Sequence, residues 1–389
     1  MSAAAATVRA LLGERTGTDP DDWHLVFKAR YGMLVVFRAL AAARGGGEVA
    51  TQVFTCSTAV DPIVAAGLSP AHGEVSPASV ALDPARLVVT TATRAVVAQH
   101  TFGIVDDAGT AGLRARADAA GALLVEDSAH CVGRMARRAD GAPLADVSVH
   151  SFGVEKMLPT RFGGAVWVSP ALRDGVLRSA ITSGLAGLPA AGRRLDVAAR
   201  AYRTEVRVLN RLPGGVAGAV RGALTAAGAF EPAIAPVEGR GGLPYEPMAP
   251  SAWMVEQIAA ALPGLAANED RRSAAVEVYL RELAGVVEIP GAVAAPAPLV
   301  RFPFFAPDGA SAEAVLRALA SGGFYGGRWY RPALFPGVED PGVYGYTPGD
   351  GRLAVTEDLV TRVVNLPTNV APGDARRAAG LVRRVLATG

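Results

Sequence analysis

The sequence predicts an α/β protein with a large domain built on a mostly parallel sheet and a smaller C-terminal α/β domain. Apolar, strand-like runs alternate with helical segments between residues 29 and 168, which is the pattern of a parallel sheet covered on both faces. The chain has 389 residues, too many for one small core. Half of these residues are apolar and 19% are charged, as in folded globular proteins.

The large domain is expected to cover residues 1–250. Residues 32–43 carry apolar side chains at the spacing of one helical face, and a second helix is expected at residues 108–121, where a glycine ends it. Four buried strands are expected, at residues 95–99, 122–126, 147–152 and 165–168. In such a sheet, the functional site lies at the carboxyl ends of the strands.

The smaller domain is expected to cover residues 251–389, with Pro250 as the approximate boundary. Before it, residues 195–209 form a predicted helix, and a run rich in Gly, Pro and Ala mixes helix with loop. After it, helices and strands alternate again, with helices at 253–262, around 276–283, at 311–320 and 374–386, and strands at 299–305 and 362–369. Residues 322–351 form a long aromatic loop, a type of loop that often lines sites.

Charge and composition argue against several classes of protein. The formal net charge is +2, with 38 basic and 36 acidic residues, so nucleic acid and anionic membranes are not expected as partners. No apolar stretch is long enough to span a membrane, and the N-terminus lacks the pattern of a signal peptide. Two cysteines, Cys56 and Cys131, give no disulfide framework, and no metal-ligand spacing is present. A cytoplasmic, metal-free protein is therefore expected.

The scarcity of lysine is informative. Only Lys28 and Lys156 are lysines among the 38 basic residues, so arginine supplies almost all of the positive charge. A lysine amine can lose its proton and attack a carbonyl, which an arginine guanidinium cannot do. We interpret Lys28 as an ordinary surface charge, whereas the residues around Lys156 point to chemistry.

Asp127 and Lys156 follow two neighbouring predicted strands, so both should lie at the same edge of the sheet. A lysine and an aspartate there suit pyridoxal 5'-phosphate (PLP), because the lysine can hold the cofactor as a Schiff base and the aspartate can pair with its pyridine nitrogen. Ser151 could bind the cofactor phosphate, and a helix beginning at Tyr31 and Gly32 could add backbone N–H groups. The alternative is that Asp127 caps a turn and Lys156 is exposed.

The region from residue 123 to 168 resembles the DegT-type sugar aminotransferases, a family of fold-type I PLP enzymes. The motifs that carry this resemblance are Asp127-Ser128-Ala129-His130, Ala145-Asp146, Ser151-Phe152-Gly153-Val154-Glu155-Lys156 and Gly163-Gly164. Weaker matches in the same order are Gly67-Leu68-Ser69-Pro70, His100-Thr101-Phe102-Gly103 and Asn365-Leu366-Pro367. The resemblance therefore extends over most of the chain.

The resemblance implies a role for each matching residue. Lys156 would be the Schiff-base lysine and proton shuttle, Asp127 the partner of the pyridine nitrogen, His130 a contact of the ring's phenolic oxygen, and Ser151 a phosphate ligand. It also implies a homodimer with a shared active site, for which Arg193, Arg194 and Tyr202 are candidate contacts, although a solvated helix face is the simpler interpretation.

Two positions depart from the family pattern. The phosphate-binding triplet reads Arg30-Tyr31-Gly32, so Arg30 or the Tyr31 hydroxyl could compensate, or Arg30 could be a solvated charge. The aromatic residue that stacks on the cofactor falls on Cys56, unless a short shift places Phe54 there.

Arg328, Tyr330 and Arg331 of the aromatic loop are candidate ligands for a substrate carboxylate or nucleotide phosphate, because arginine suits bidentate contacts with oxyanions. Charged loop residues without a ligand are the alternative.

The function implied by the resemblance is a PLP-dependent aminotransferase. It would move an amino group from glutamate or glutamine to the carbonyl of a keto-sugar, expected to be linked to a nucleotide. A PLP enzyme of the same fold that racemises, eliminates or joins carbons at Cα is one alternative. A non-catalytic assembly protein that keeps the fold is the other.

Overall fold

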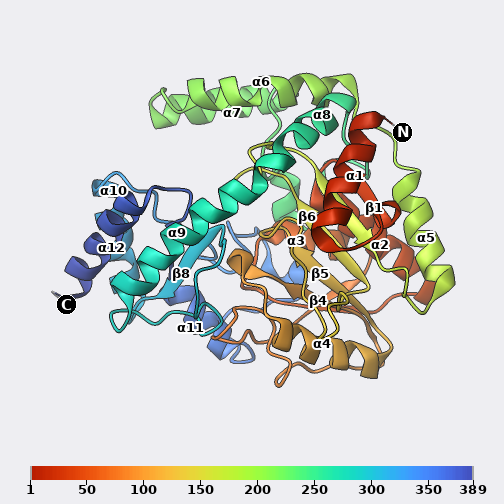
Figure 1. Cartoon of the computed structure of the whole chain (residues 1–389), viewed down its shortest axis with the longest axis horizontal. Helices are drawn as coiled ribbons and strands as arrows, with labels where there is room; N and C mark the ends of the chain where they lie inside the picture. The colour runs from red at the N-terminus through yellow and green to blue at the C-terminus, as the bar shows by residue number, and fades with distance from the viewer. Residues whose placement is uncertain (1, 388–389) are drawn as a thin grey trace.

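The computed structural model describes residues 2–387 and consists of a larger and a smaller α/β part, which lie side by side in Figure 1. A seven-stranded sheet forms the centre of the larger part, in the order β1-β7-β6-β5-β4-β2-β3. Strand β7 runs antiparallel to both of its neighbours, and every other pair is parallel. The strands are β1 Trp23–Val26, β2 Glu48–Thr51, β3 Ser69–His72, β4 Thr93–Gln99, β5 Leu123–Ser128, β6 Val147–Ser151 and β7 Gly164–Val168. The predicted fold class is confirmed.

Helices cover both faces of this sheet, because consecutive strand residues alternate between two apolar cores. Val125 and Val166 belong to the core that packs under α2 (Ala29–Arg44), α3 (Ser57–Ala65) and α5 (Gly175–Ala186). Leu124 belongs to the opposite core with α4 (Asp107–Ala120), and Trp167 packs in the core reached by α1 (Ala3–Thr16). The strands at the centre are buried throughout, which is why they appear in the sequence as continuous apolar runs.

The contact between α2 and β7 depends on one glycine. A Cβ atom added to Gly32 would lie 2.4 Å from Cγ2 of Val166, which is fully buried. We expect Gly32→Ala to lower the free energy of unfolding by about 1–3 kcal/mol, the usual cost of overpacking a core. Urea denaturation followed by circular dichroism checks this value. The control is Gly218→Ala on α7 (Gly214–Ala226), where a Cβ meets no atom within 4 Å. Equal stability of both variants would contradict the prediction.

The smaller part contains the antiparallel pair β8 (Arg301–Phe305) and β9 (Val363–Pro367). Its helices are α9 Leu265–Leu283, α10 Gly309–Ser321, α11 Ala354–Arg362 and α12 Pro372–Ala387. Phe302 and Phe304 of β8 share one apolar core with Phe54 and Phe102 of the larger part, so the two parts are packed together. Helix α8 (Ala252–Ala261) follows the expected boundary at Pro250 but packs on α1, and α9 then leads into the smaller part (Figure 1).

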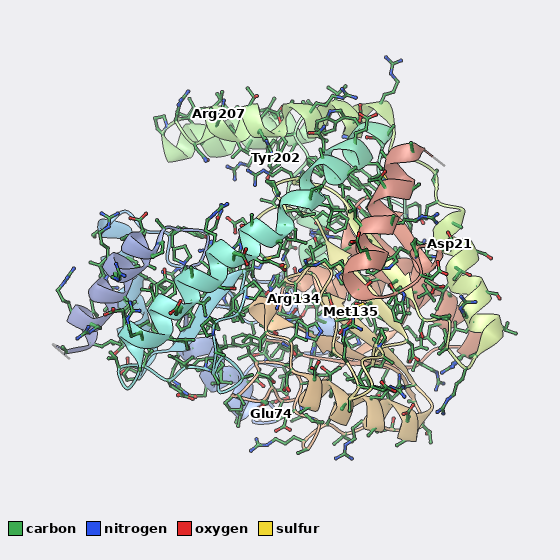
Figure 2. The ribbon with its side chains drawn as sticks, viewed as in Figure 1. Asp21, Glu74, Arg134, Met135, Tyr202 and Arg207 are labelled. Carbon is green, nitrogen blue, oxygen red and sulfur yellow. The ribbon has the colours of Figure 1, made fainter. Side chains whose placement is uncertain are left out.

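Two helices project from the larger part as a hairpin, α6 (Arg193–Leu209) and α7 (Figure 1). No residue of α7 is buried. Tyr202 lies nearer the body of the molecule and Arg207 nearer the tip of the hairpin (Figure 2). Among residues 2–387, no helix is both long and apolar enough to cross a membrane.

Candidate active site

A cavity of about 330 Å³ lies at the carboxyl ends of the parallel strands, where the sequence predicts the site. Its wall includes one residue at or beyond the carboxyl end of each of four strands. These residues are Cys56 after β2, His100 after β4, Asp127 near the end of β5 and Ser151 at the end of β6. This volume is at the lower end of the roughly 300–1,000 Å³ that is usual for sites of small molecules.

Asp127 is held rigidly at the end of β5. It pairs in register with Gln99 of β4 and Val149 of β6, and it is 7% exposed. Its Oδ1 accepts a hydrogen bond from the Ala129 N–H at 2.9 Å, and no described residue donates to Oδ2. Burial raises the pKa of this carboxyl, while the Ala129 N–H and the Lys156 ammonium oppose the shift. A cationic donor placed beside Oδ2 would therefore stabilise the carboxylate.

Lys156 lines the same cavity, from the loop after β6. Its Nζ lies 5.3 Å from the centre of the Trp329 ring, and it forms no ion pair or hydrogen bond with another described residue. Burial lowers the pKa of its ammonium group, and the neighbouring Cys56 and Asp127 oppose that shift. The amine is thus deprotonated more readily than an exposed lysine, which is the state that attacks a carbonyl.

His130 is fixed between the sheet and the aromatic loop. Its Nδ1 accepts a hydrogen bond from the Phe102 N–H at 3.0 Å. A neutral His130 ring therefore carries its proton on Nε2, and this nitrogen lies 3.3 Å from the Tyr330 hydroxyl. The imidazole stacks on Trp329 at 5.2 Å between ring centroids. Burial first, and then the charge of Lys156, hold the pKa of His130 well below its usual value. The ring is therefore neutral at neutral pH.

A buried hydrogen-bond network supports the strand that carries Asp127. Glu126 accepts hydrogen bonds from His100 Nε2 at 2.7 Å, from the Ser148 hydroxyl and from the Ala136 N–H. Burial alone would raise the pKa of Glu126, but these partners outweigh it and lower the pKa. The His100 N–H donates to the Asp127 carbonyl at 3.0 Å, so the network holds the backbone of both strand ends in place.

The two candidates for stacking on the cofactor differ in position. Cys56 lines the cavity, with its Sγ accepting a hydrogen bond from the Thr58 hydroxyl at 3.1 Å. Phe54 is fully buried behind the wall, where it contacts Tyr330 at 5.6 Å between centroids. Ser151 lines the cavity, and its hydroxyl accepts a weak hydrogen bond from the Gly153 N–H at 3.3 Å.

The start of α2 differs from the expected phosphate loop. Helix α2 begins at Ala29, two residues before Tyr31, and Ala29 and Arg30 line the cavity. Tyr31 is fully buried in an apolar core, where it packs on Phe27, and its hydroxyl has no partner among the described residues. Gly32 faces β7, so its local role is close packing.

The interpretation of Lys28 as an ordinary surface charge is wrong. Lys28 is 8% exposed, lines the cavity and forms an ion pair with Glu231. Arg30 likewise forms an ion pair with the buried Glu238, and it is not a solvated charge. Both carboxylates lie more than 200 residues along the chain, so the sequence alone gave no signal for these pairs.

The remaining candidate residues lie in two places, the aromatic loop and the helical hairpin. Tyr330 lines the cavity, whereas Arg328 and Arg331 form ion pairs with Glu313 of α10, at 2.6 and 2.7 Å. The other candidates lie on α6. Tyr202 of that helix is buried against Phe162 and Phe230, so a solvated helix face is wrong for it, while Arg193 and Arg194 are exposed. Sequence reasoning did not single out Trp329, which the tertiary fold brings against Lys156.

The cavity fits PLP at its reactive end. Lys156 and Asp127 line the same cavity, and Nζ of the first and Oδ2 of the second have no hydrogen-bond partner among the described residues, as an aldehyde and a protonated pyridine nitrogen require. At the other end, the positive charges of Lys28 and Arg30 are already balanced by Glu231 and Glu238. Within residues 2–387, no group of three His, Cys, Asp or Glu side chains could hold a metal ion.

The fold and this site define the chain as an α/β protein with a lysine and an aspartate on the wall of one cavity at the edge of its sheet. Residues 28–182 match the DegT/DnrJ/EryC1/StrS aminotransferase family, a segment that includes Asp127, His130, Ser151 and Lys156. The match covers less than half of the chain, so it shows what this segment is similar to.

Comparisons with individual proteins give a partial sequence match and two likenesses of fold. The chain is 31% identical over 147 residues to the L-glutamine:2-deoxy-scyllo-inosose aminotransferase of Streptoalloteichus tenebrarius. This match covers 33% of this chain and 34% of that protein. The match thus spans about a third of that relative's length. Among solved structures, DesI in the presence of its TDP-sugar product is 22% identical, with a TM-score of 0.67 over 99% of this chain and 85% of the other. The PMP form of Spr1654 from Streptococcus pneumoniae, a putative sugar aminotransferase, is 16% identical, with a TM-score of 0.71 over 100% and 93%.

Proposed function

We propose that this protein is a PLP-dependent aminotransferase that moves an amino group from an amino acid to the carbonyl carbon of a keto-sugar. The observation that carries the proposal is the placement of Lys156 and Asp127 on the wall of one cavity. Neither forms an ion pair or a hydrogen bond with another described side chain, and the Ala129 N–H occupies only Oδ1 of Asp127. The match of residues 28–182 to the DegT/DnrJ/EryC1/StrS aminotransferase family supports the same conclusion.

Four residues would hold the cofactor. Lys156 would carry it covalently, Asp127 would accept a hydrogen bond from the pyridine nitrogen, His130 would contact the phenolic oxygen, and Ser151 would donate to the phosphate. Bound PLP withdraws electrons from the substrate Cα when its C–H bond breaks.

The protein's own groups would move the proton and exclude water. Burial lowers the pKa of Lys156, so its Nζ would give up and take back a proton more readily than an exposed lysine. The negative charge of Asp127 would hold a proton on the ring nitrogen, and this positive partner would offset the cost of burying the carboxylate. Trp329 and Tyr330, both buried, cover the cavity on the side of the aromatic loop and keep its dielectric constant low.

The proposed amino donor is glutamine or glutamate, and the proposed acceptor is a keto-sugar linked to a nucleotide. A glutamine donor is supported by the name of the relative from Streptoalloteichus tenebrarius, and a nucleotide sugar by the TDP-sugar in the DesI structure. We also propose that the protein acts as a homodimer with a shared active site, as the sequence resemblance implies.

A half-reaction tests the proposal directly. Purified protein loaded with PLP is mixed with L-glutamine or L-glutamate, without an acceptor, and the absorbance spectrum and the keto acid are followed. We expect conversion of the cofactor to its pyridoxamine form with one equivalent of keto acid per active site. Adding a keto-sugar should restore the PLP spectrum.

The alternatives give different results in the same experiment. An enzyme that racemises or eliminates would change its amino-acid substrate catalytically without accumulating pyridoxamine phosphate. An assembly protein would show no cofactor spectrum at all. Either result would overturn the proposed function.

A further inference from the structure

A strap of chain, residues 229–249, lies at the end of the cavity where α2 begins. Its Ala233 and Ile234 line the cavity together with Lys28 and Arg30. Apart from a short 3₁₀ helix, Pro236–Arg240, the strap contains no helix and no strand of the sheet. Its position over the cavity therefore depends on side-chain contacts with the rest of the larger part.

Glu238 anchors the strap firmly. It is fully buried and pairs with Arg30, and its second carboxylate oxygen accepts a hydrogen bond from the Ala235 N–H. Its backbone carbonyl accepts a hydrogen bond from the Tyr344 hydroxyl at 2.7 Å. A ligand that displaced Glu238 from Arg30 would have to break this buried set of bonds, so we expect the pair to stay intact.

Glu231 is held differently, between two cations. Its Oε1 pairs with Lys28, and its Oε2 accepts a hydrogen bond from the Tyr245 hydroxyl at 2.7 Å. The Tyr245 oxygen in turn accepts a hydrogen bond from Arg194 at 3.0 Å. Arg194 is exposed and forms no ion pair with a described residue. Glu231 can therefore turn from the buried cation in the cavity wall to a cation at the surface and still have a charged partner.

Lys28 needs an anion beside it wherever Glu231 lies. It is buried, and burial first and then the charge of Arg30 lower the pKa of its ammonium group, while Glu231 and Glu238 oppose that shift. Removing Glu231 without a replacement would leave a buried charge unpaired, which is strongly destabilising. A phosphate group can supply the replacement, because it carries more negative charge than a carboxylate and has three acceptor oxygens.

We propose that this strap is a gate at the phosphate end of the cavity, where the phosphate of the incoming cofactor takes Lys28 from Glu231 and Glu231 turns to Arg194. The pair of Glu238 with Arg30 is the fixed anchor of the gate. Glu231 thus competes with the cofactor phosphate for one ammonium group, and it stabilises the protein before the cofactor enters. The inference rests on the proposed function, since it describes how the cofactor reaches its place.

Binding of pyridoxine 5'-phosphate tests the proposal, because this compound has the phosphate of the cofactor but no aldehyde that could react with Lys156. In calorimetric titration, we expect Glu231→Gln to bind it about 10-fold more tightly than the wild type, since a charged competitor for Lys28 is gone. Glu246→Gln is the matched control. It lies on the same strap, but its partner Arg38 does not line the cavity, so binding should be unchanged.

A double-mutant cycle shows whether Glu231 acts through Lys28. In a Lys28→Met background, Glu231→Gln should no longer change the affinity for pyridoxine 5'-phosphate, because the contact for which the two anions compete is absent. If Glu231 only kept Lys28 in place for the phosphate, the single variant would bind more weakly than the wild type.

Hydrogen exchange followed by mass spectrometry tests the movement itself. A bound ligand usually slows exchange in the backbone around it, whereas opening of the gate should make residues 229–235 exchange faster when pyridoxine 5'-phosphate saturates the protein. This measurement uses the wild-type protein, so it does not depend on the stability of a variant.

The outcomes separate the gate from the proposed function. Equal or weaker binding by Glu231→Gln would overturn the gate, and so would unchanged or slower exchange of residues 229–235, since Glu231 would then only repel the phosphate without moving. Failure of the wild type to attach PLP covalently, with tighter binding of pyridoxine 5'-phosphate by Glu231→Gln and faster exchange of the strap, would overturn the proposed function and support the gate.

Discussion

Replacing Lys156 by alanine is expected to abolish covalent cofactor attachment and to slow transamination by about 10²- to 10⁴-fold, the usual contribution of a general acid–base group. The variant lacks the one amine on the cavity wall that is proposed to hold the cofactor and to carry the proton. Borohydride reduction of PLP-loaded protein, followed by intact mass spectrometry, measures the attachment. The wild type should gain the mass of one cofactor and the variant none.

The composition of the chain provides a clean control for this experiment. Lys28 is the other lysine in the sequence, and Lys28→Arg keeps the positive charge that pairs with Glu231 while removing the second amine. This variant should still become labelled with PLP. Lys156→Arg keeps a positive charge near Asp127 but has no amine, so it should remain unlabelled. A folded but unlabelled Lys156→Arg shows that the amine itself, and not the folding of the protein, is required for attachment. A label found on Lys28, or retained in Lys156→Ala, would refute the assignment.

Replacing Asp127 by asparagine is expected to leave covalent attachment intact and to lower the transamination rate by about 10²- to 10³-fold. Asparagine keeps the shape and can still accept from the Ala129 N–H, but it carries no charge to hold a proton on the pyridine nitrogen. The expected loss is the range observed when one preorganised electrostatic group is removed from an active site. Stopped-flow measurement of the half-reaction with L-glutamine or L-glutamate gives the rate.

A structural role for Asp127 predicts something different. If the carboxylate only stabilised the end of β5, Asp127→Asn would lower the melting temperature and leave the half-reaction rate of the folded protein unchanged. We expect the rate to fall while the melting temperature stays equal or rises, because burial raises the pKa of this carboxyl and a neutral amide removes that cost. Asp21→Asn, at an exposed position (Figure 2), should change neither quantity.

Local sequence patterns were sufficient for the central strands and for several of the helices. Strands β4 to β7 are continuous apolar runs because helices cover both faces of the sheet, and α2, α4 and α12 show helical spacing or clear end signals. Strands β1, β2 and β3 were not predicted. Each has four residues, too few to show a period, and each forms only because it pairs with a strand distant in sequence.

In the candidate site, too, some residues could be predicted from local sequence patterns and others could not. Asp127 and Lys156 could be identified because one lies near the end of an apolar strand and the other in the loop after the next strand. The carboxyl ends of such neighbouring parallel strands meet at one edge. The partners of Lys28 and Arg30 could not, because Glu231 and Glu238 lie more than 200 residues away and no local pattern links them. Trp329 reaches Lys156 from a loop in the smaller part for the same reason.

The sequence by itself determined that a scarce amine and a carboxylate stand at the edge of a mostly parallel sheet, because both are fixed by the strands they follow. Only the tertiary structure decided how the charges around them are balanced. Lys28 and Arg30, at the start of α2, are paired with carboxylates more than 200 residues away in the sequence. Four arginines and one glutamate, Glu155, line a second cavity next to Lys156. Charge balance depends on which residues meet in space, and the order of residues along the chain does not specify that.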